Sequence, residues 1–195
     1  MTKEYSIWKD IGLWILLVFN AYTLYYCYQY PNAIHTVYVV FWIQSVCIGF
    51  FNVLGILLFH KSNQPISNSG NTSSGCAALF FAVHYGIFHF VYLIFLTIKL
   101  VDIAKLDFTF IKISLWAIVA GGVIQFFQDR SRSVSNPVNV STMFFMPYIR
   151  IVPMHLVILL PNFIHVSATT LFLTLKILAD IIMHIVYSKF LFQKK

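Results

Sequence analysis

The sequence predicts an all-α membrane protein: a polytopic bundle of six transmembrane helices that forms one transmembrane domain over residues 1–195. Of these 195 residues, 59% are hydrophobic and only 10% are charged, and the mean hydropathy is +0.81. A soluble domain is roughly one-quarter charged, because water must solvate its surface. The apolar residues also form stretches that, as helices, are long enough to cross a hydrocarbon core of about 30 Å.

Six apolar stretches form the predicted helices, and turn signals separate them. They span residues 11–29, 33–59, 76–100, 108–127, 146–166 and 168–192. Pro31-Asn32 favours a turn between the first two. A low-complexity loop of Ser, Asn and Gly at 62–75 and a polar loop at 128–142 separate the next ones. The final apolar stretch is too long for one span, so we divide it at the polar residues Ser167 and Thr169.

The distribution of lysine and arginine predicts the orientation, because cytoplasmic loops of membrane proteins are enriched in both residues. One side of the predicted bundle holds Lys3, Lys9, Lys61, Arg130, Arg132, Arg150, Lys189, Lys194 and Lys195. The other side holds only Lys99, Lys105 and Lys112. Both termini are therefore expected in the cytoplasm.

The net charge of +7 suits anionic lipid headgroups at the membrane surface. We do not expect nucleic acid to be a partner, because no basic run alternates with aromatic residues as in single-strand binders. The lipid bilayer is the expected partner. A homo-oligomer or a second membrane protein remains open as a further partner.

Polar side chains inside the predicted helices form the candidate site, because a charged one costs about 2.5–3.5 kcal/mol at the centre of a span. The candidates are Asn52, His84, Arg150, His155, Lys176, Asp180 and His184. By depth they fall in the cytoplasmic half of the bilayer, with Arg150 at the mouth of the site. Lys176, Asp180 and His184 are each four residues apart and share one helix face. Pro153 adds a predicted kink beside Arg150.

The histidines and the aspartate suggest a metal site, because imidazole and carboxylate groups ligate divalent cations. The candidate ligands are His84, His155, Asp180 and His184. Asp180 would either ligate the ion or orient His184. No HExxH, Walker or CxxC motif identifies a cofactor, and a haem held by two histidines is the less favoured alternative. The competing interpretation is structural, with these side chains joining helices through hydrogen bonds.

Four strings also carry a resemblance to a known family. They are WIQSVCIGFFNVLGI (Trp42–Ile56), FFAVHYGIFHFVY (Phe80–Tyr92), PYIRIVPMHLVILL (Pro147–Leu160) and LKILAD (Leu175–Asp180). They resemble the bacterial integral-membrane family catalogued as domain of unknown function 6498. The resemblance implies a bacterial inner-membrane location and no assigned activity. Its pattern points to His84, Tyr85, Gly86, Arg150, His155, Lys176 and Asp180. The chain departs from it at Leu160-Pro161-Asn162, where a glycine-rich helix end is expected.

Three functions remain open for a multi-pass protein of the bacterial inner (plasma) membrane. The first is a membrane-embedded enzyme or metal-binding site, in which Arg150 would hold an anionic headgroup or substrate. The second is a small transporter or a proton or ion relay through Lys176, Asp180 and His184, although no internal repeat supports a transporter. The third is an accessory subunit of a larger membrane complex.

Overall fold

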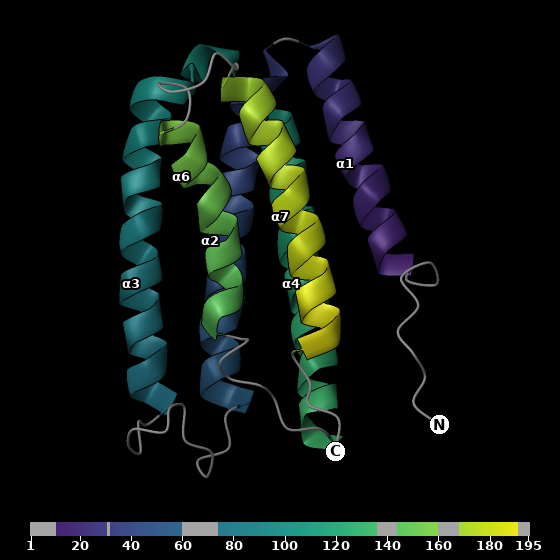
Figure 1. The fold of residues 1–195 in the computed structure, drawn as a ribbon, viewed down its shortest axis with the longest axis vertical. Helices are drawn as coiled ribbons and strands as arrows, with labels where there is room; N and C mark the ends of the chain where they lie inside the picture. Colours follow the sequence, from purple (N-terminus) through teal and green to yellow (C-terminus); the bar gives the residue numbers. More distant parts are fainter. Residues whose placement is uncertain (1–10, 31, 60–73, 136–143, 160–167, 191–195) are drawn as a thin grey trace.

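The computed structural model describes residues 11–30, 32–59, 74–135, 144–159 and 168–190. Within these ranges the chain consists of helices and short turns and contains no strand. The prediction of an all-α protein is therefore confirmed. The long helices lie side by side along the long axis of the molecule (Figure 1).

The described helices follow one another in a simple order. They are α1 (Ile11–Gln29), α2 (Ala33–Phe59), α3 (Ser74–Phe95), α4 (Phe108–Ser135), α6 (Ile151–Leu159) and α7 (Ala168–Phe190). A π-helical turn, η2 (Leu96–Leu100), continues α3, and two 3-10 turns, η3 (Ile103–Lys105) and η4 (Met146–Arg150), precede α4 and α6. Helices α1 and α2 begin and end at the predicted residues.

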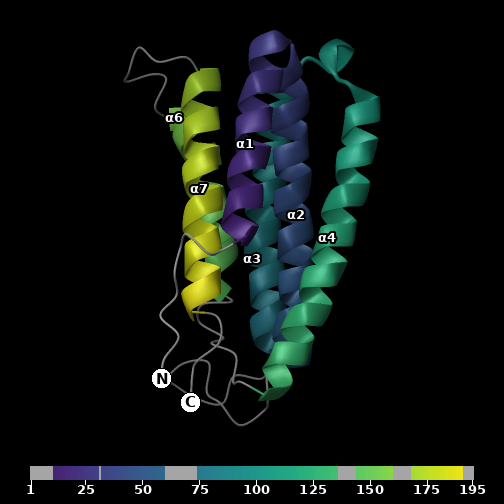
Figure 2. The ribbon, with the colours of Figure 1, turned by 90° about the vertical axis from the view of Figure 1, so that its right-hand side faces the viewer.

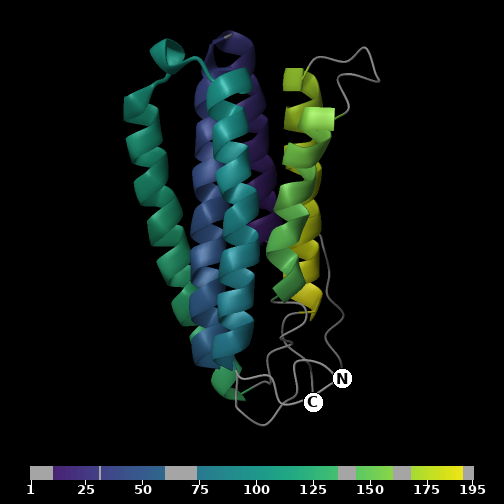
Figure 3. The same ribbon diagram turned by 90° about the vertical axis from the view of Figure 1, so that its left-hand side faces the viewer.

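Successive helices alternate in direction, so that the first residue of α1 and the last residue of α7 lie at the same end of the bundle (Figure 1). Helix α2 is the centre of the packing and contacts α1, α3, α4 and η4. Helix α4 lies on one side of the group formed by α1, α2 and α3, and α6 and α7 lie on the other (Figures 2 and 3). Helix α7 packs against α1, α6 and η4.

Four helical segments are long and apolar enough to cross a membrane, judged by length and composition. They are Ala33–Leu58, Gly75–Leu100, Phe108–Ser131 and Thr169–Val186. Large apolar side chains along them are exposed, among them Ile98 at 70% and Trp116 at 75%. Such surfaces suit lipid better than water. These findings support a membrane protein, whereas six spans remain a prediction.

The connection between α3 and α4 is held by two aspartates that accept hydrogen bonds from the backbone. Asp102 pairs with Lys105 at 3.1 Å and accepts from the Ala104 nitrogen at 3.1 Å. The hydrogen bond from Lys105 and that from Ala104 together hold the pKa of Asp102 below its usual value. Asp107 accepts from the Phe110 nitrogen at 2.9 Å and so caps the start of α4.

The end of α4 differs from the prediction, which placed a polar loop after residue 127. Instead, α4 continues through this polar segment. Gln125 donates to Asp129 at 3.0 Å along the helix, and Arg130 donates to the Leu58 carbonyl of α2 at 2.6 Å. The apolar stretch marks the thickness of a hydrocarbon core, whereas the helix is prolonged by polar contacts that hydropathy does not report.

The predicted helix 146–166 is also different, because it starts as a 3-10 turn. In η4, Pro147 lies at the beginning, and α6 starts directly after Arg150. Pro153 lies in the first turn of α6 and has no N–H group to donate to the Ile149 carbonyl. The kink predicted beside Arg150 stays a prediction. Residues 160–167, where we predicted the turn to the last helix, lie outside the described part of the chain.

The aromatic core lies between α2, α3, η4 and α7. Phe172 of α7 is fully buried and makes edge-to-face contacts with Tyr38 and Phe41 of α2, with ring centroids 4.6 and 5.2 Å apart. The Arg150 guanidinium lies over the ring of Phe41, 4.8 Å from its centroid. The aromatic core therefore ends at a buried charge.

Two adjacent glycines of α4 are expected to respond in opposite ways to substitution by alanine. A Cβ at Gly122 would overlap the ring of Phe51 on α2, whereas a Cβ at Gly121 meets nothing within 4 Å. We expect Gly122→Ala to cost about 1–3 kcal/mol through overpacking. Gly121→Ala should be neutral or stabilise by up to about 1 kcal/mol, because alanine favours helix. Thermal unfolding in detergent measures both, and equal effects would contradict this close approach of α2 and α4.

Candidate functional site

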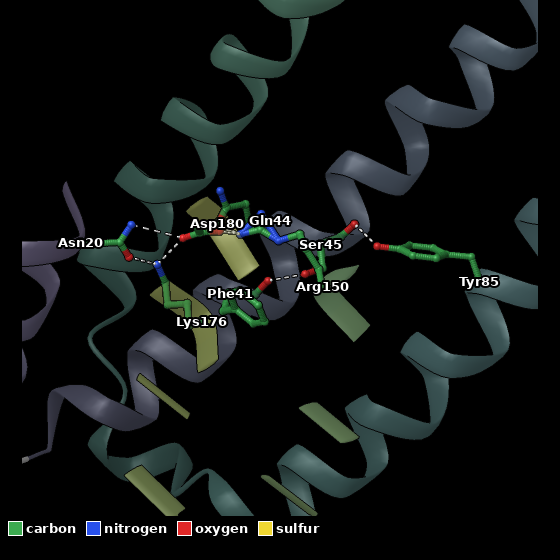
Figure 4. A network of polar contacts seen from close by, with 8 residues as sticks. All are labelled: Asn20, Phe41, Gln44, Ser45, Tyr85, Arg150, Lys176 and Asp180. Carbon is green, nitrogen blue, oxygen red and sulfur yellow. Dashed lines mark hydrogen bonds and ion pairs between the residues drawn. The ribbon is translucent and has the colours of Figure 1, made fainter. Parts of the chain in front are cut away.

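Asp180 of α7 is the centre of a buried group of polar side chains (Figure 4). One carboxylate oxygen accepts from Arg150 Nη2 at 2.7 Å, and the other accepts from Lys176 Nζ at 2.8 Å. Asn20 of α1 accepts from Lys176 at 2.7 Å and donates to Asp180 at 3.5 Å. Gln44 accepts a hydrogen bond from Arg150. We call these five residues, Asn20, Gln44, Arg150, Lys176 and Asp180, the buried network.

Arg150 lies inside the buried network, and its placement corrects the prediction that it would stand at the mouth of the site. Only 3% of this residue is exposed. Its Nη2 donates to Gln44 Oε1 at 2.9 Å as well as to Asp180, and its Nε has no hydrogen-bond partner among the described residues. The reason is that η4 packs between α2 and α7, so the arginine at its end points into the bundle.

The buried network also lies deeper than predicted. Asn20, Gln44 and Asp180 are near the middle of α1, α2 and α7 respectively, not toward one end of the helices. Its members come from α1, α2, η4 and α7 (Figure 4). Of the predicted candidates, the structure thus brings together Arg150, Lys176 and Asp180.

Two of the predicted histidines lie elsewhere, in separate pairs with tyrosines between α3 and the segment formed by η4 and α6. His84 Nδ1 shares a hydrogen bond with the Tyr148 hydroxyl at 2.7 Å. His155 Nδ1 shares a short hydrogen bond with the Tyr92 hydroxyl. The His84 side chain is exposed and His155 is half-buried. Neither pair includes a carboxylate.

The two remaining candidate residues are His184 and Asn52. His184 is half-buried on α7, one turn beyond Asp180. Asn52 of α2 is half-buried, and its Nδ2 has no hydrogen-bond partner within the described ranges. No group of three or more His, Cys, Asp or Glu in the described part of the chain could hold a metal ion. The four predicted metal ligands are therefore not assembled into one site.

Some residues that make these contacts were not among the candidates predicted from the sequence. Gln44 carried a usable signal, because an amide in the middle of an apolar helix needs a partner. Tyr92 and Tyr148 carried none, since the chain has 11 tyrosines and nothing in their spacing distinguishes these two. Ser45 lies next to Gln44, and its carbonyl accepts from the Tyr85 hydroxyl at 3.0 Å.

A small cavity of about 30 Å³ lies beside the buried network. Gln44 and Lys176 line it, together with residues of α1, α2 and the start of α4. A cavity of 10–15 Å³ on this measure is enough for one water molecule. The space beside Lys176 is therefore about the size of two water molecules.

The described helices and the buried network define the class of protein: an all-helical bundle with segments apolar enough to cross a membrane and a charged site in its interior. A family model described as "Family of unknown function (DUF6498)" matches residues 6–190. The chain belongs to this family, which confirms the resemblance seen in the sequence. No curated protein and no solved structure matches it.

Proposed function

We propose that the protein is a multi-pass protein of the bacterial inner membrane, with six spans and both termini in the cytoplasm, and that its buried network relays protons or ions. The alternating helix directions support an even number of spans (Figure 1). Helix α1 has 19 residues, a rise of about 28 Å, which is close to the thickness of a hydrocarbon core. The excess of lysine and arginine on one side supports the orientation.

The observation that carries the relay is the contact of Lys176 Nζ with Asp180 at 2.8 Å near the middle of the bundle. Ionisable groups at this depth are costly and mark ion and proton pathways. Arg150 stays protonated under all physiological conditions, whereas a buried lysine can release its proton. Lys176 is therefore the member of the network that exchanges a proton, and Arg150 holds the other carboxylate oxygen of Asp180.

The release of the Lys176 proton changes the net charge of the buried network. With Lys176 protonated, Arg150 and Lys176 carry two positive charges against one negative charge on Asp180. The ammonium is held by Asp180 and Asn20 at 2.8 and 2.7 Å. When the proton leaves, the neutral amine remains beside an ion pair of Arg150 and Asp180, and the network has no net charge.

His184 is the next group toward the end of α7. It lies four residues beyond Asp180, a rise of about 6 Å along the helix, on the same face. An imidazole can accept a proton at one ring nitrogen and donate one from the other, so His184 suits the transfer of a proton between the buried network and that end of the bundle.

The two other functions have less support in the geometry. A metal-dependent enzyme would need ligands that converge, and the described histidines lie in separate pairs with tyrosines. An accessory subunit would co-purify with a partner in fixed stoichiometry. The buried network does not require one, because its contacts are made within one chain.

Proton flux into proteoliposomes tests the relay. Under an imposed pH gradient, Lys176→Met should lower the flux that a pH-sensitive dye reports by about tenfold or more, since each 1.4 kcal/mol of barrier is a factor of ten. The variant should still fold, because the ion pair of Arg150 and Asp180 remains. Lys112→Met, at an exposed lysine of α4, is the matched control. Equal flux in Lys176→Met and the unmodified protein would exclude Lys176 from the relay.

A further inference from the structure

His35, near the start of α2, has one ring nitrogen that contacts two backbone groups with opposite requirements. Its Nδ1 lies 2.9 Å from the Leu100 carbonyl oxygen and 3.2 Å from the Asp102 backbone nitrogen. A carbonyl only accepts a hydrogen bond and a backbone N–H group only donates one, whereas an imidazole nitrogen either carries a proton or offers a lone pair. The His35 nitrogen can therefore satisfy only one of these two backbone groups at a time.

The protonation state of the His35 ring decides which of the two hydrogen bonds forms. In the imidazolium both ring nitrogens carry protons, so Nδ1 donates to Leu100 and the Asp102 N–H group loses its acceptor. In the neutral ring with its proton on Nε2, Nδ1 accepts from Asp102 and no longer binds Leu100. Both backbone groups lie within reach of the same nitrogen, so the ring exchanges one for the other with little movement.

The Leu100 carbonyl lies at the end of the π-helical turn η2. The last carbonyls of a helix have no partner within it and carry partial negative charge. A protonated His35 both donates to this carbonyl and brings a positive charge to the helix end. Turns of the π-helical kind are rare and occur frequently at functional sites.

The charged groups around His35 come from the connection between α3 and α4. The Asp102 carboxylate interacts with the charge of His35, and Lys105 pairs with Asp102 at 3.1 Å. Hydrogen bonds from Lys105 and from the Ala104 nitrogen hold the pKa of Asp102 below its usual value, so a negative charge stays beside the ring. The titratable side chains on the segments next to His35 are Tyr26, Cys27, Tyr28 and Tyr30 of α1, Tyr38 of α2, and Lys99, Asp102, Lys105, Asp107 and Lys112 from η2 to the start of α4.

The same connection forms part of the wall of an open pocket of about 430 Å³, to which Lys105, Asp107 and Thr36 contribute. Thr36, the next residue on α2, accepts from the Asp107 nitrogen at 3.0 Å, a contact that does not depend on the His35 proton. Lys105 is different, because it is paired with Asp102. A change at the Asp102 backbone is therefore passed to a side chain of the pocket wall.

We propose that His35 is a proton-sensitive switch for the connection between α3 and α4. The imidazolium holds the end of η2 through Leu100, and the neutral ring holds the start of η3 through Asp102, with Lys105 and the pocket wall following Asp102. The start of α2 lies at the opposite end of the bundle from the first residue of α1 (Figure 1). In the orientation proposed above, the switch therefore responds to the pH on the side of the membrane away from the cytoplasm. It uses no residue of the buried network and does not depend on the relay.

Nuclear magnetic resonance of the full-length protein, labelled with nitrogen-15 in detergent micelles, tests the switch. As the pH is lowered from mildly alkaline to mildly acidic conditions, the ring nitrogens of His35 report when the ring becomes an imidazolium. The Asp102 amide proton should move upfield with the same midpoint, because it loses the hydrogen bond to Nδ1. An Asp102 amide signal that does not follow the His35 ring overturns the proposal.

His35→Asn shows whether the ring is the cause, because asparagine places an amide near the position of Nδ1 and does not titrate. In this variant the Asp102 amide signal should stay constant over the same pH range. His84→Asn, at an exposed histidine of α3, is the matched control and should keep the response of the unmodified protein. A response that persists in His35→Asn would assign it to another group and overturn the switch, while the relay would be unaffected.

Discussion

Asp180→Asn is expected to be the most destabilising substitution in the buried network, by about 3–5 kcal/mol. It removes the one carboxylate that Arg150 and Lys176 share and leaves two buried cations without a counter-charge. Asparagine has nearly the same shape, so lost packing contributes little. The midpoint of unfolding by heat or by sodium dodecyl sulfate, measured in detergent, reports the loss.

Two comparisons show whether charge is the cause. Lys176→Met alone should destabilise less than Asp180→Asn, because the ion pair of Arg150 and Asp180 survives. Adding Lys176→Met to Asp180→Asn should restore part of the stability, because it removes one of the two unpaired cations. If Asp180→Asn were no worse than Lys176→Met, or if the double variant were the sum of both losses, the charge balance would not govern this network.

Gly49→Ala is expected to destabilise the packing of α2 against α3 by about 1–3 kcal/mol. A Cβ at position 49 of α2 would overlap the ring of Tyr85 on α3. That ring has little freedom to move: Tyr85 is only 4% exposed, stacks on Phe81 with centroids 5.0 Å apart, and donates to the Ser45 carbonyl at 3.0 Å. Glycine is therefore required for this close approach of α2 and α3.

Gly86→Ala provides the matched control for Gly49→Ala. Gly86 follows Tyr85 directly on α3, but a Cβ there meets nothing within 4 Å. The substitution should be neutral or stabilise by up to about 1 kcal/mol. Unfolding midpoints of the two variants in the same detergent give the comparison. Equal losses at both positions would mean that the Tyr85 ring does not constrain Gly49.

The energetic cost of the buried network supports the relay that we propose. A buried ion pair contributes little to stability compared with apolar residues of similar volume, because both charges lose their hydration. This chain nevertheless places Arg150, Lys176 and Asp180 together in its interior, beside a cavity that Lys176 lines. An apolar core would have joined the same helices without this cost.

The sequence predicted those features that depend on local patterns. The bounds of α1 and α2 followed from apolar stretches interrupted by Pro31-Asn32. The contact of Lys176 with Asp180 followed from their spacing of four residues on one helix. The end of α4 was missed, since Arg130 prolongs the helix through a contact with the Leu58 carbonyl of another helix.

Arg150 and the histidines show which features local sequence patterns do not determine. Arg150 was selected for its charge, but its burial depends on η4 packing between two other helices. His84 and His155 were assigned to the same site as Asp180 because their depths agreed. Depth does not specify rotation about the helix axis, and the rotations of α3 and α6 direct both histidines to tyrosines.

Composition and hydropathy were thus sufficient for the helical class, for spans of membrane length and for the presence of costly polar groups inside them. These properties depend on residues close together in the chain. Which polar groups meet was settled by the packing of helices against one another, since Asn20 and Asp180 are 160 residues apart. Asp180 takes its other partners, Arg150 and Asn20, from η4 and α1, and the relative rotation of two helices depends on side-chain packing over their whole interface.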